Sequence, residues 1–172
     1  METRYLATTD SPAGPLHVAV TGDGQLCGIW FGVVTSGVEV EASLHRRGRA
    51  PVWDSDRVAH VTAQIAEYGD RRRTSFDLKL AIEGGEWEQQ VWQALLTIPY
   101  GETRSYGQIA TQLGDPSKAR AVGWANAANP IPLVIPCHRV IGANRNLTGF
   151  GGGIDAKIQL LAHEGAMLPS LA

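Results

Sequence analysis

The chain has 172 residues, of which 44% are apolar and 19% charged, a composition typical of globular proteins rather than disordered or fibrous ones. No apolar run reaches the roughly 18 to 20 residues of a membrane span, and the N-terminus begins no secretory segment, so we expect a cytoplasmic protein. A net charge of −2 neither requires nor excludes a polyanionic partner, although residues 99–145 carry five basic and only two acidic side chains.

The first third of the chain alternates β-prone runs with Gly and Pro residues, which predicts an antiparallel sheet. Its clearest part is a hairpin, with strands at residues 15–21 and 25–31 joined by a Thr-Gly-Asp-Gly turn. Residues 35–49 lack a clear period and are predicted to be loop. A helix is predicted at residues 56–68, and the strict alternation of residues 76–82 indicates a half-buried strand.

The apolar period changes to that of a helix at Glu86, because apolar residues then recur every three or four positions up to Pro99. Ser105 with Gln108 matches a capping box that would begin a second helix, and Gly114 fits its end. These patterns predict that the second half of the chain is mostly helical.

A third helix is predicted after Asp115 and Pro116, which suit a helix cap and a first helical turn. Its inward face would hold Ala119, Val122, Gly123 and Asn126. Two short helices joined by Gly-Asp-Pro are typical of a helix-turn-helix. Residues 157–163 indicate one last helix.

Cys137 and His138 are adjacent between two apolar runs. Burying polar side chains costs free energy unless they are hydrogen-bonded, so this pair calls for a structural or functional explanation. A thiolate is a nucleophile, and an imidazole oriented by a carboxylate could take the thiol proton at neutral pH. The plainer alternative is a small buried thiol beside a hydrogen-bonded core histidine. Adjacent side chains usually diverge, so direct contact is not expected unless a water molecule bridges them.

The run Pro136-Cys137-His138-Arg139-Val140 resembles the active-site motif of the O6-alkylguanine-DNA alkyltransferases, the repair methyltransferases. The resemblance spans residues 86–165 and includes Ile98-Pro99-Tyr100-Gly101, Ser105-Tyr106, Arg120-Ala121-Val122-Gly123, Asn129-Pro130 and residues 160–165. It implies direct-reversal DNA repair by a single-turnover, suicide methyltransferase without a cofactor. An alkyl group would pass irreversibly from O6-alkylguanine in DNA to Cys137, and activity on O4-alkylthymine is left open.

The resemblance also implies roles for single residues. Cys137 would accept the alkyl group, His138 would be its water-relayed base, and Glu164 would orient His138. Asn129 would bond to backbone in both the helix-turn-helix and the active-site loop, although a plain Asx-turn before proline explains it locally. Tyr106 would donate a hydrogen bond to the base and crowd the adjacent phosphate.

The implied partner is double-stranded DNA with an alkylated guanine that is turned out of the stack. Arg120 would fill the gap in the duplex, and three small residues would allow close approach to the minor groove: Ala119, Gly123 and Ala127. The substrate pocket would be lined by Pro132, Val140, Phe150, Gly151 and Trp92. In it, the main-chain carbonyls of Val140 and Cys137 would receive the exocyclic amine of guanine. We expect a monomer, located at the nucleoid in a bacterium, and leave cooperative assembly on DNA open.

Three positions depart from the family pattern. Trp124 stands where many relatives have a smaller residue, so it either folds into the core or alters the groove contact. Phe150 and Gly151 replace the Tyr and Ser of some relatives, which removes a hydroxyl. Cys27 and three N-terminal histidines show no ligand spacing, so we predict no metal site and a core position for Cys27.

The predicted fold class is α+β in two parts. Residues 1–84 would form an N-terminal α/β domain with a small antiparallel sheet, and residues 85–172 a helical, winged-helix-like domain for DNA binding and alkyl transfer. The main alternative is a non-catalytic alkyltransferase-like protein that binds lesions, but such proteins lack the cysteine. A transcription regulator would leave the Cys-His pair unexplained, and nothing here resembles the oxyanion loop of a cysteine hydrolase.

Overall fold

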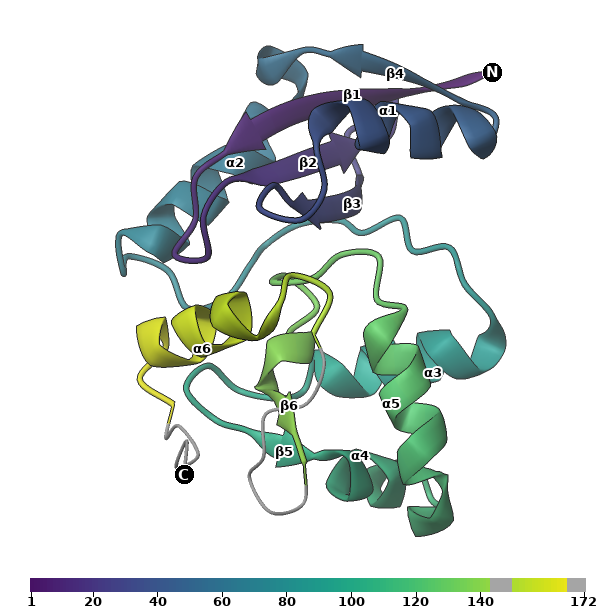
Figure 1. Cartoon of the computed structure of the whole chain (residues 1–172), viewed down its shortest axis with the longest axis vertical. Coiled ribbons are helices and arrows are strands. Elements are labelled where there is room, and N and C mark those ends of the chain that lie inside the picture. Colours follow the sequence, from purple (N-terminus) through teal and green to yellow (C-terminus); the bar gives the residue numbers. More distant parts are fainter. Residues whose placement is uncertain (143–149, 167–172) are drawn as a thin grey trace. The chain divides into compact units, whose positions relative to one another are not determined.

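The computed structural model describes residues 1–142 and 150–166. The chain divides into two compact units, Met1–Glu83 and Gly84–Ala172. A small sheet dominates the first unit and helices dominate the second (Figure 1), which confirms the predicted α+β class. Within the described residues, no helix is long and apolar enough to cross a membrane.

The first unit is built on a four-stranded sheet with the strand order β3-β2-β1-β4. The strands are β1 (Glu2–Thr9), β2 (Leu16–Val20), β3 (Leu26–Phe31) and β4 (Arg49–Trp53). The first three are antiparallel neighbours, whereas β4 runs parallel to β1. The predicted hairpin is confirmed in β2 and β3, and the sheet that was predicted to be antiparallel has one parallel pair, β1 with β4.

Two helices cover this sheet. Figure 1 shows α1 (Gly37–Arg46) in front of the sheet and α2 (Ser55–Gly69) behind it. A buried cluster joins α1 to the sheet and consists of Leu6, Ala19, Val40 and Leu44. Cys27 is half-buried against this cluster, and its thiol donates to the Ala19 carbonyl at 3.3 Å. The helix predicted at residues 56–68 corresponds to α2.

The prediction of a loop at residues 35–49 is wrong, because α1 occupies most of this segment. Ser36 caps the helix: its hydroxyl accepts from the Glu39 N–H, and its own N–H donates to the Glu39 carboxylate at 2.7 Å. Only Val40 and Leu44 are buried on the helix, so its apolar stripe is too short to show a period. The Ser-x-x-Glu spacing was the available signal for this helix.

The strand predicted at residues 76–82 is also absent from the sheet. Leu80 forms a single parallel bridge beside β3, where the Leu26 N–H donates to Lys79 at 2.9 Å and the Ala81 N–H donates to Leu26 at 2.8 Å. The alternation therefore reflects an extended, half-buried segment without a continuous ladder.

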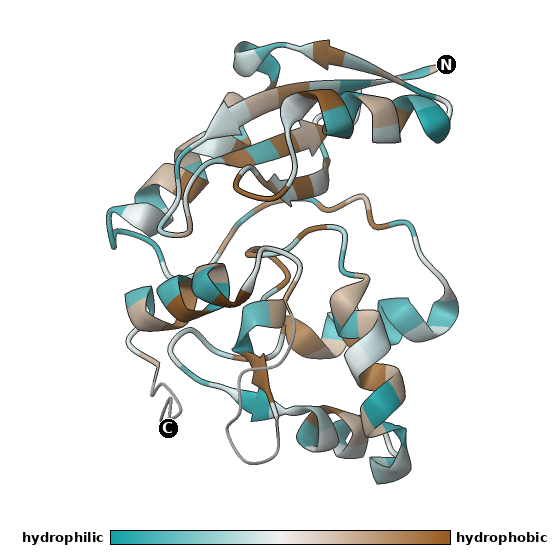
Figure 2. Cartoon of the chain, viewed as in Figure 1, coloured by the Kyte–Doolittle hydropathy of each residue, from teal (hydrophilic) through white to brown (hydrophobic). Residues whose placement is uncertain are grey.

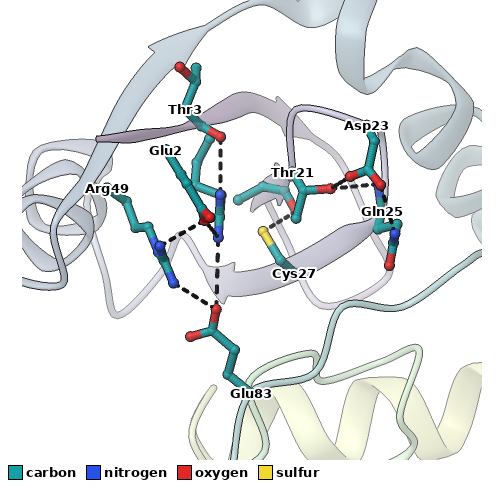
Figure 3. A network of polar contacts seen from close by, with 10 residues as sticks. Glu2, Thr3, Thr21, Asp23, Gln25, Cys27, Arg49 and Glu83 are labelled. Atoms are coloured by element: carbon teal, nitrogen blue, oxygen red, sulfur yellow. Dashed lines mark hydrogen bonds and ion pairs between the residues drawn. The ribbon is translucent and has the colours of Figure 1, made fainter.

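A polar network joins distant parts of the first unit (Figure 3). Arg49 donates to Glu2 at 2.7 Å and to Glu83 at 2.9 Å, and the buried Arg4 donates to Glu2 at 3.1 Å. Ion pairs whose carboxylates are this exposed stabilise a fold only weakly. Their effect here is to tie the end of this unit to strands β1 and β4.

The second unit contains four α-helices, two short 3-10 helices and a two-stranded parallel ladder, in its described residues. In chain order these are α3 (Glu86–Leu95), β5 (Arg104–Ser105), α4 (Tyr106–Gln112), η1 (Pro116–Lys118), α5 (Ala119–Ala127), η2 (Cys137–Arg139), β6 (Val140–Ile141) and α6 (Ile154–His163). Figure 2 shows that helices in both units mix hydrophilic and hydrophobic residues, as expected of helices that bury one face.

Two tryptophans pin α3 to α5. The indole of Trp92 donates to the Ala125 carbonyl at 2.8 Å, and that of Trp87 donates to Ala121 at 3.1 Å. Trp92 is buried, so the hydrogen bond satisfies its only polar atom. These bonds fix the helix that leads into the loop before Cys137.

The predicted capping box of α4 is confirmed: Ser105 accepts from the Gln108 N–H, and Gln108 accepts from the Ser105 N–H at 2.8 Å. Gly114 follows the helix with a φ of +94°, a left-handed conformation that glycine adopts without strain. Asp115 then caps η1 through the Ser117 N–H, and α5 continues directly from this turn. The capping box thereby fixes the start of the helix that carries Tyr106.

Candidate active site

Cys137 opens the 3-10 helix η2 inside the most buried part of the second unit. Residues 131–141 are all buried, and Cys137 itself is 4% exposed. Burial raises the pKa of its thiol to about 11, while a hydrogen bond with Asn129 and the charge of Lys157 act in the opposite direction. At neutral pH, on the order of one chain in 10,000 would hold a thiolate. A thiol held in this way is almost entirely protonated at neutral pH, so it could act as a nucleophile only with a base that accepts its proton.

The neighbouring histidine is held by a carboxylate. His138 is fully buried, and its Nε2 lies 3.0 and 2.9 Å from the two carboxylate oxygens of Glu164, the residue that follows α6. Glu164 can only accept, so Nε2 carries the hydrogen. The predicted pairing of His138 with Glu164 is present in the structure.

Arg139 completes a three-residue cluster. Its Nε and Nη2 donate to the two oxygens of Glu164 at 2.7 and 3.0 Å, and its Nη1 donates to the Ile98 carbonyl at 2.7 Å. Burial alone would raise the pKa of Glu164, but the hydrogen bonds and charges of His138 and Arg139 lower it to about 2. The carboxylate is thus charged at any physiological pH, and Arg139 balances it.

This balance leaves His138 neutral. Burial lowers its pKa, as do the charges of Arg139 and Lys157, against the opposing effect of Glu164. With Nε2 protonated, Nδ1 carries the lone pair, and within the described residues it has no hydrogen-bond partner. A buried, neutral imidazole with an uncommitted lone pair, one residue from a buried thiol, can accept a proton.

Asn129 fixes the loop that leads to Cys137. Its Nδ2 donates to the Ile135 carbonyl at 2.8 Å, and its Oδ1 accepts from the Ile131 N–H at 3.0 Å. Both partners lie in the loop, so the expectation of one bond to the helix-turn-helix and one to the loop is wrong. The side chain instead holds the loop closed just after α5.

Two further residues face this site without having been singled out as functional. The buried Asn126 of α5 has its Nδ2 3.5 Å from the Cys137 carbonyl. Lys157 of α6 is fully buried and donates to the Val140 carbonyl at 2.6 Å. The signal in the sequence was a polar residue at a position that must be buried: Asn126 and Lys157 on the inward faces of helices, and Arg139 within an apolar run.

The predicted DNA-contacting residues occupy two sides of α5. Arg120 and Ala127 are exposed, whereas Ala119 and Gly123 are half-buried. A Cβ at Gly123 would lie 3.7 Å from the ring of Tyr106, so this glycine faces α4. Trp124 is 74% exposed, which excludes the alternative that it folds into the core.

The residues predicted to line the substrate pocket differ in exposure. Pro132 and Val140 are buried, Phe150 is half-buried and Gly151 is exposed. Trp92 is committed to α5, which is a packing role. The pocket as a whole stays a prediction.

The cationic segment at residues 99–145 offers less surface charge than its sequence indicates. Arg139 is buried in its ion pair with Glu164, and Arg104 forms an ion pair with Glu102, with 3.4 Å between the guanidinium nitrogen and the carboxylate oxygen. Arg145 lies outside the described residues. Lys118 and Arg120, on either side of the start of α5, are exposed cations, and the ammonium group of Lys118 also lies 4.9 Å from the centre of the Trp87 ring.

Among residues 1–142 and 150–166, no group of three or more His, Cys, Asp or Glu side chains is placed to hold a metal ion. The acidic and imidazole groups of the site bind each other instead.

Comparison with known proteins gives consistent matches. The family model described as 6-O-methylguanine DNA methyltransferase, DNA binding domain, matches residues 86–166. A methylated-DNA–protein-cysteine methyltransferase of Mycobacterium tuberculosis is 45% identical over 168 residues, which is 96% of this chain and 95% of the relative. One of Methanosarcina acetivorans is 43% identical over 162 residues, covering 94% and 99%. The crystal structure of Mycobacterium tuberculosis OGT in complex with DNA has a TM-score of 0.80 and 42% identity, covering 96% of each chain.

The Glu164 cluster predicts a specific acid sensitivity. Because the pKa of Glu164 is about 2 in the folded chain and 4.5 ordinarily, its contribution is complete above about pH 5 and is lost as the pH falls toward 2. The Glu164→Gln variant should be less stable at neutral pH, since Arg139 loses its counter-ion. Between about pH 5 and pH 2.5 it should lose on the order of 2 to 3 kcal/mol less unfolding free energy than the wild type. Urea unfolding across this range gives the unfolding free energy as a function of pH for the wild type and the variant. If the two curves ran parallel, the low pKa of Glu164 would be contradicted.

Proposed function

The chain belongs to the methylated-DNA–protein-cysteine methyltransferase family, and from this premise we propose that Cys137 is the residue that accepts the alkyl group of O6-alkylguanine in duplex DNA. The family membership makes the protein a DNA-binding repair enzyme that transfers an alkyl group to one of its own cysteines. The assignment to Cys137 is supported by its place beside His138, whose lone pair is uncommitted and whose other nitrogen is fixed by Glu164.

The alternative cysteine is poorly suited to the reaction. Cys27 lies in the first unit and its thiol donates to a backbone carbonyl. Burial raises its pKa to about 11, as it does that of Cys137, so the two thiols differ in their neighbours and not in acidity. The charged groups that interact with it are Arg4, Arg49 and Glu83, none of which is a proton acceptor matched to a thiol at neutral pH. Figure 3 shows Cys27 together with Arg49 and Glu83. Among the residues that the structure describes, no histidine is paired with Cys27.

The transfer proceeds as an in-line displacement at carbon. As His138 takes the thiol proton through a bridging water molecule, the Cys137 sulfur forms a bond to the alkyl carbon, and the bond between that carbon and O6 breaks. The electron pair of the broken bond moves onto guanine, and the Tyr106 hydroxyl stabilises the developing charge by donating a hydrogen bond. The guanine ring then takes up a proton from water, and His138 releases the thiol proton to water, so the proton count is unchanged. The product thioether has no leaving group for water to displace, so each chain reacts once.

The buried sulfur requires an extruded nucleotide. A guanine stacked in a duplex cannot reach a residue that is 4% exposed, so the damaged base must leave the stack and enter the protein. Arg120, exposed at the start of α5, takes the space that the base leaves, and Lys118 binds backbone phosphate nearby. Trp124 shares the exposed side of α5 and adds an apolar contact in the shallow groove.

A non-catalytic lesion-binding protein would not need this arrangement. It would keep the DNA-binding helices and the pocket but would have no use for a thiol beside a buried, oriented base. The nearly full-length similarity to methyltransferases, together with Cys137, favours catalysis.

The proposal predicts a stoichiometric label transfer. When a duplex carrying O6-methylguanine with a labelled methyl group is incubated with the protein, the label should move to the chain up to one equivalent. A tryptic digest should place it on the peptide that contains Cys137. The Cys27→Ser variant is the matched control and should react as the wild type does.

Two outcomes would contradict this assignment. The label could stay on the DNA in the presence of folded protein, or a Cys137→Ser variant could still accept it. More than one equivalent per chain would rule out the single-turnover reaction.

The Arg120 proposal predicts a difference between substrates. The Arg120→Ala variant should react about tenfold to a thousandfold more slowly with the duplex, because base extrusion costs a few kcal/mol that the wedge offsets. Its reaction with free O6-benzylguanine, which needs no extrusion, should change less than about twofold, since Arg120 is exposed and outside the active-site cluster.

Single-turnover rates with the two substrates make this comparison. Arg72→Ala, which removes an exposed arginine from the first unit, is the control and should match the wild type with both. Equal losses of Arg120→Ala on both substrates would remove the wedge role.

A further inference from the structure

Two buried acceptor atoms beside the cysteine lack hydrogen-bond partners. Within the described residues, they are the only buried side-chain nitrogen or oxygen atoms of which this is true: Oδ1 of Asn126 and Nδ1 of His138. Both side chains are almost completely removed from solvent, with 4% and 0% exposure. Burying an acceptor without a donor costs free energy, so two such atoms in one place call for an explanation.

The two atoms belong to residues that flank a single peptide group. Asn126 of α5 has its Nδ2 3.5 Å from the carbonyl oxygen of Cys137, and His138 supplies the nitrogen of the same peptide. The thiol of Cys137 is carried by the residue on the carbonyl side. One donor, the thiol, and two acceptors are therefore grouped around one bond of the chain.

The contact with Cys137 fixes which end of the Asn126 amide carries the oxygen. If the amide were turned over, its oxygen would face the carbonyl oxygen of Cys137, and two acceptors repel each other. The nitrogen therefore stays on the carbonyl, and the oxygen is left for another donor.

The charged donors of the site are committed elsewhere. Arg139 donates to Glu164 and to the Ile98 carbonyl, and Lys157 donates to the Val140 carbonyl. A buried water molecule typically makes about three hydrogen bonds to polar groups that are otherwise unsatisfied. The thiol, Nδ1 and Oδ1 offer that number, and a water molecule between the thiol and the imidazole is already part of the proposed reaction.

We propose that Asn126 is a positioning residue for alkyl transfer, whose side-chain oxygen accepts a hydrogen bond from the water molecule that carries the Cys137 proton to His138. This inference rests on the proposed function of Cys137. The water accepts from the thiol, donates one hydrogen to Nδ1 of His138 and donates the other to Oδ1 of Asn126.

The role of Asn126 in the transfer is to orient the water. The thiol hydrogen passes to the water oxygen while one water hydrogen passes to Nδ1, so the water is re-formed and Asn126 neither gains nor loses a proton. Because Oδ1 holds one hydrogen of the water, the other points to Nδ1 and a lone pair faces the thiol. A group that is oriented beforehand lowers a barrier more than one that must reorient during the reaction.

A merely structural asparagine gives a different expectation. Leucine has nearly the shape of asparagine but neither donates nor accepts, and replacing a poorly satisfied buried polar group by an apolar one is commonly neutral or stabilising. The variants Asn126→Leu and Asn126→Met should therefore fold. Their loss should be seen in proton transfer rather than in the unfolding free energy.

The pH dependence of the rate separates the two roles. Burial raises the pKa of the Cys137 thiol to about 11, so from neutral to alkaline pH the thiolate fraction rises about tenfold for each pH unit. A thiolate has no proton to relay, so a defect in the relay should matter less as the pH rises. Arg139, Lys157 and Glu164 also face the pair, but every variant retains them, so the ratio of wild-type to variant rates cancels their titration.

The experiment compares full-length wild type with Asn126→Leu, Asn126→Met and the control Gln93→Leu, which removes an exposed amide from α3. Single-turnover transfer of labelled methyl from an O6-methylguanine duplex is followed from about pH 6.5 to about pH 9.5. Both Asn126 variants should still reach one equivalent but about tenfold more slowly at neutral pH, the effect of one hydrogen bond. This deficit should shrink toward the alkaline end of the range, whereas the control should match the wild type throughout.

Each outcome decides the matter. Asn126 variants that match the wild type at every pH would overturn the role of Asn126 and leave the proposed function intact. A deficit of the same size at every pH would also overturn it, because Asn126 would then act on packing or on base binding. If wild type transfers no label, the proposed function and this inference both fail. Should Asn126→Leu not fold, as judged by circular dichroism, Asn126→Met decides, since its unbranched side chain fits irregular space.

Discussion

The site depends on the buried carboxylate of Glu164, which accepts hydrogen bonds from both His138 and Arg139. Glu164 is charged because Arg139 compensates it through two hydrogen bonds, and it can therefore fix the tautomer of His138 without forcing that ring to take a second proton. Without Arg139, the carboxylate would favour imidazolium, which cannot act as a base. Without Glu164, nothing would direct the free lone pair of His138. The arginine within the active-site motif is thus a positioning residue for the histidine beside it.

Burial determines how the cysteine can be used. A thiol whose pKa is about 11 is inert toward most electrophiles at neutral pH, which suits a protein that can react only once. On the proposed function, reactivity depends on the substrate completing the site, because only an extruded base would bring its alkyl carbon next to Cys137. Asn129 supports this by holding the loop before the cysteine at two points, Ile131 and Ile135. The loop runs directly into His138 and Arg139, whose shared partner Glu164 follows α6.

The sequence predicted the second unit better than the first for a physical reason. Helices α3 and α4 have apolar stripes or capping boxes that report on local structure, and the motif around Cys137 is specific enough to identify a family. The helix α1 was missed because it buries only Val40 and Leu44, and the segment around Leu80 was mistaken for a strand because alternation reports burial rather than pairing. The partners of Arg139 and Lys157 depend on contacts 17 to 41 residues apart in sequence, which no local pattern reveals.

The tautomer of His138 tests the account most directly. In protein labelled with ¹⁵N on its five histidines, long-range ¹H–¹⁵N spectra distinguish protonated from unprotonated ring nitrogens, and a His138→Gln variant assigns the signal. We predict a neutral ring at neutral pH, with the hydrogen on Nε2 and a bare Nδ1. A ring protonated on both nitrogens, or one with its hydrogen on Nδ1, would contradict it.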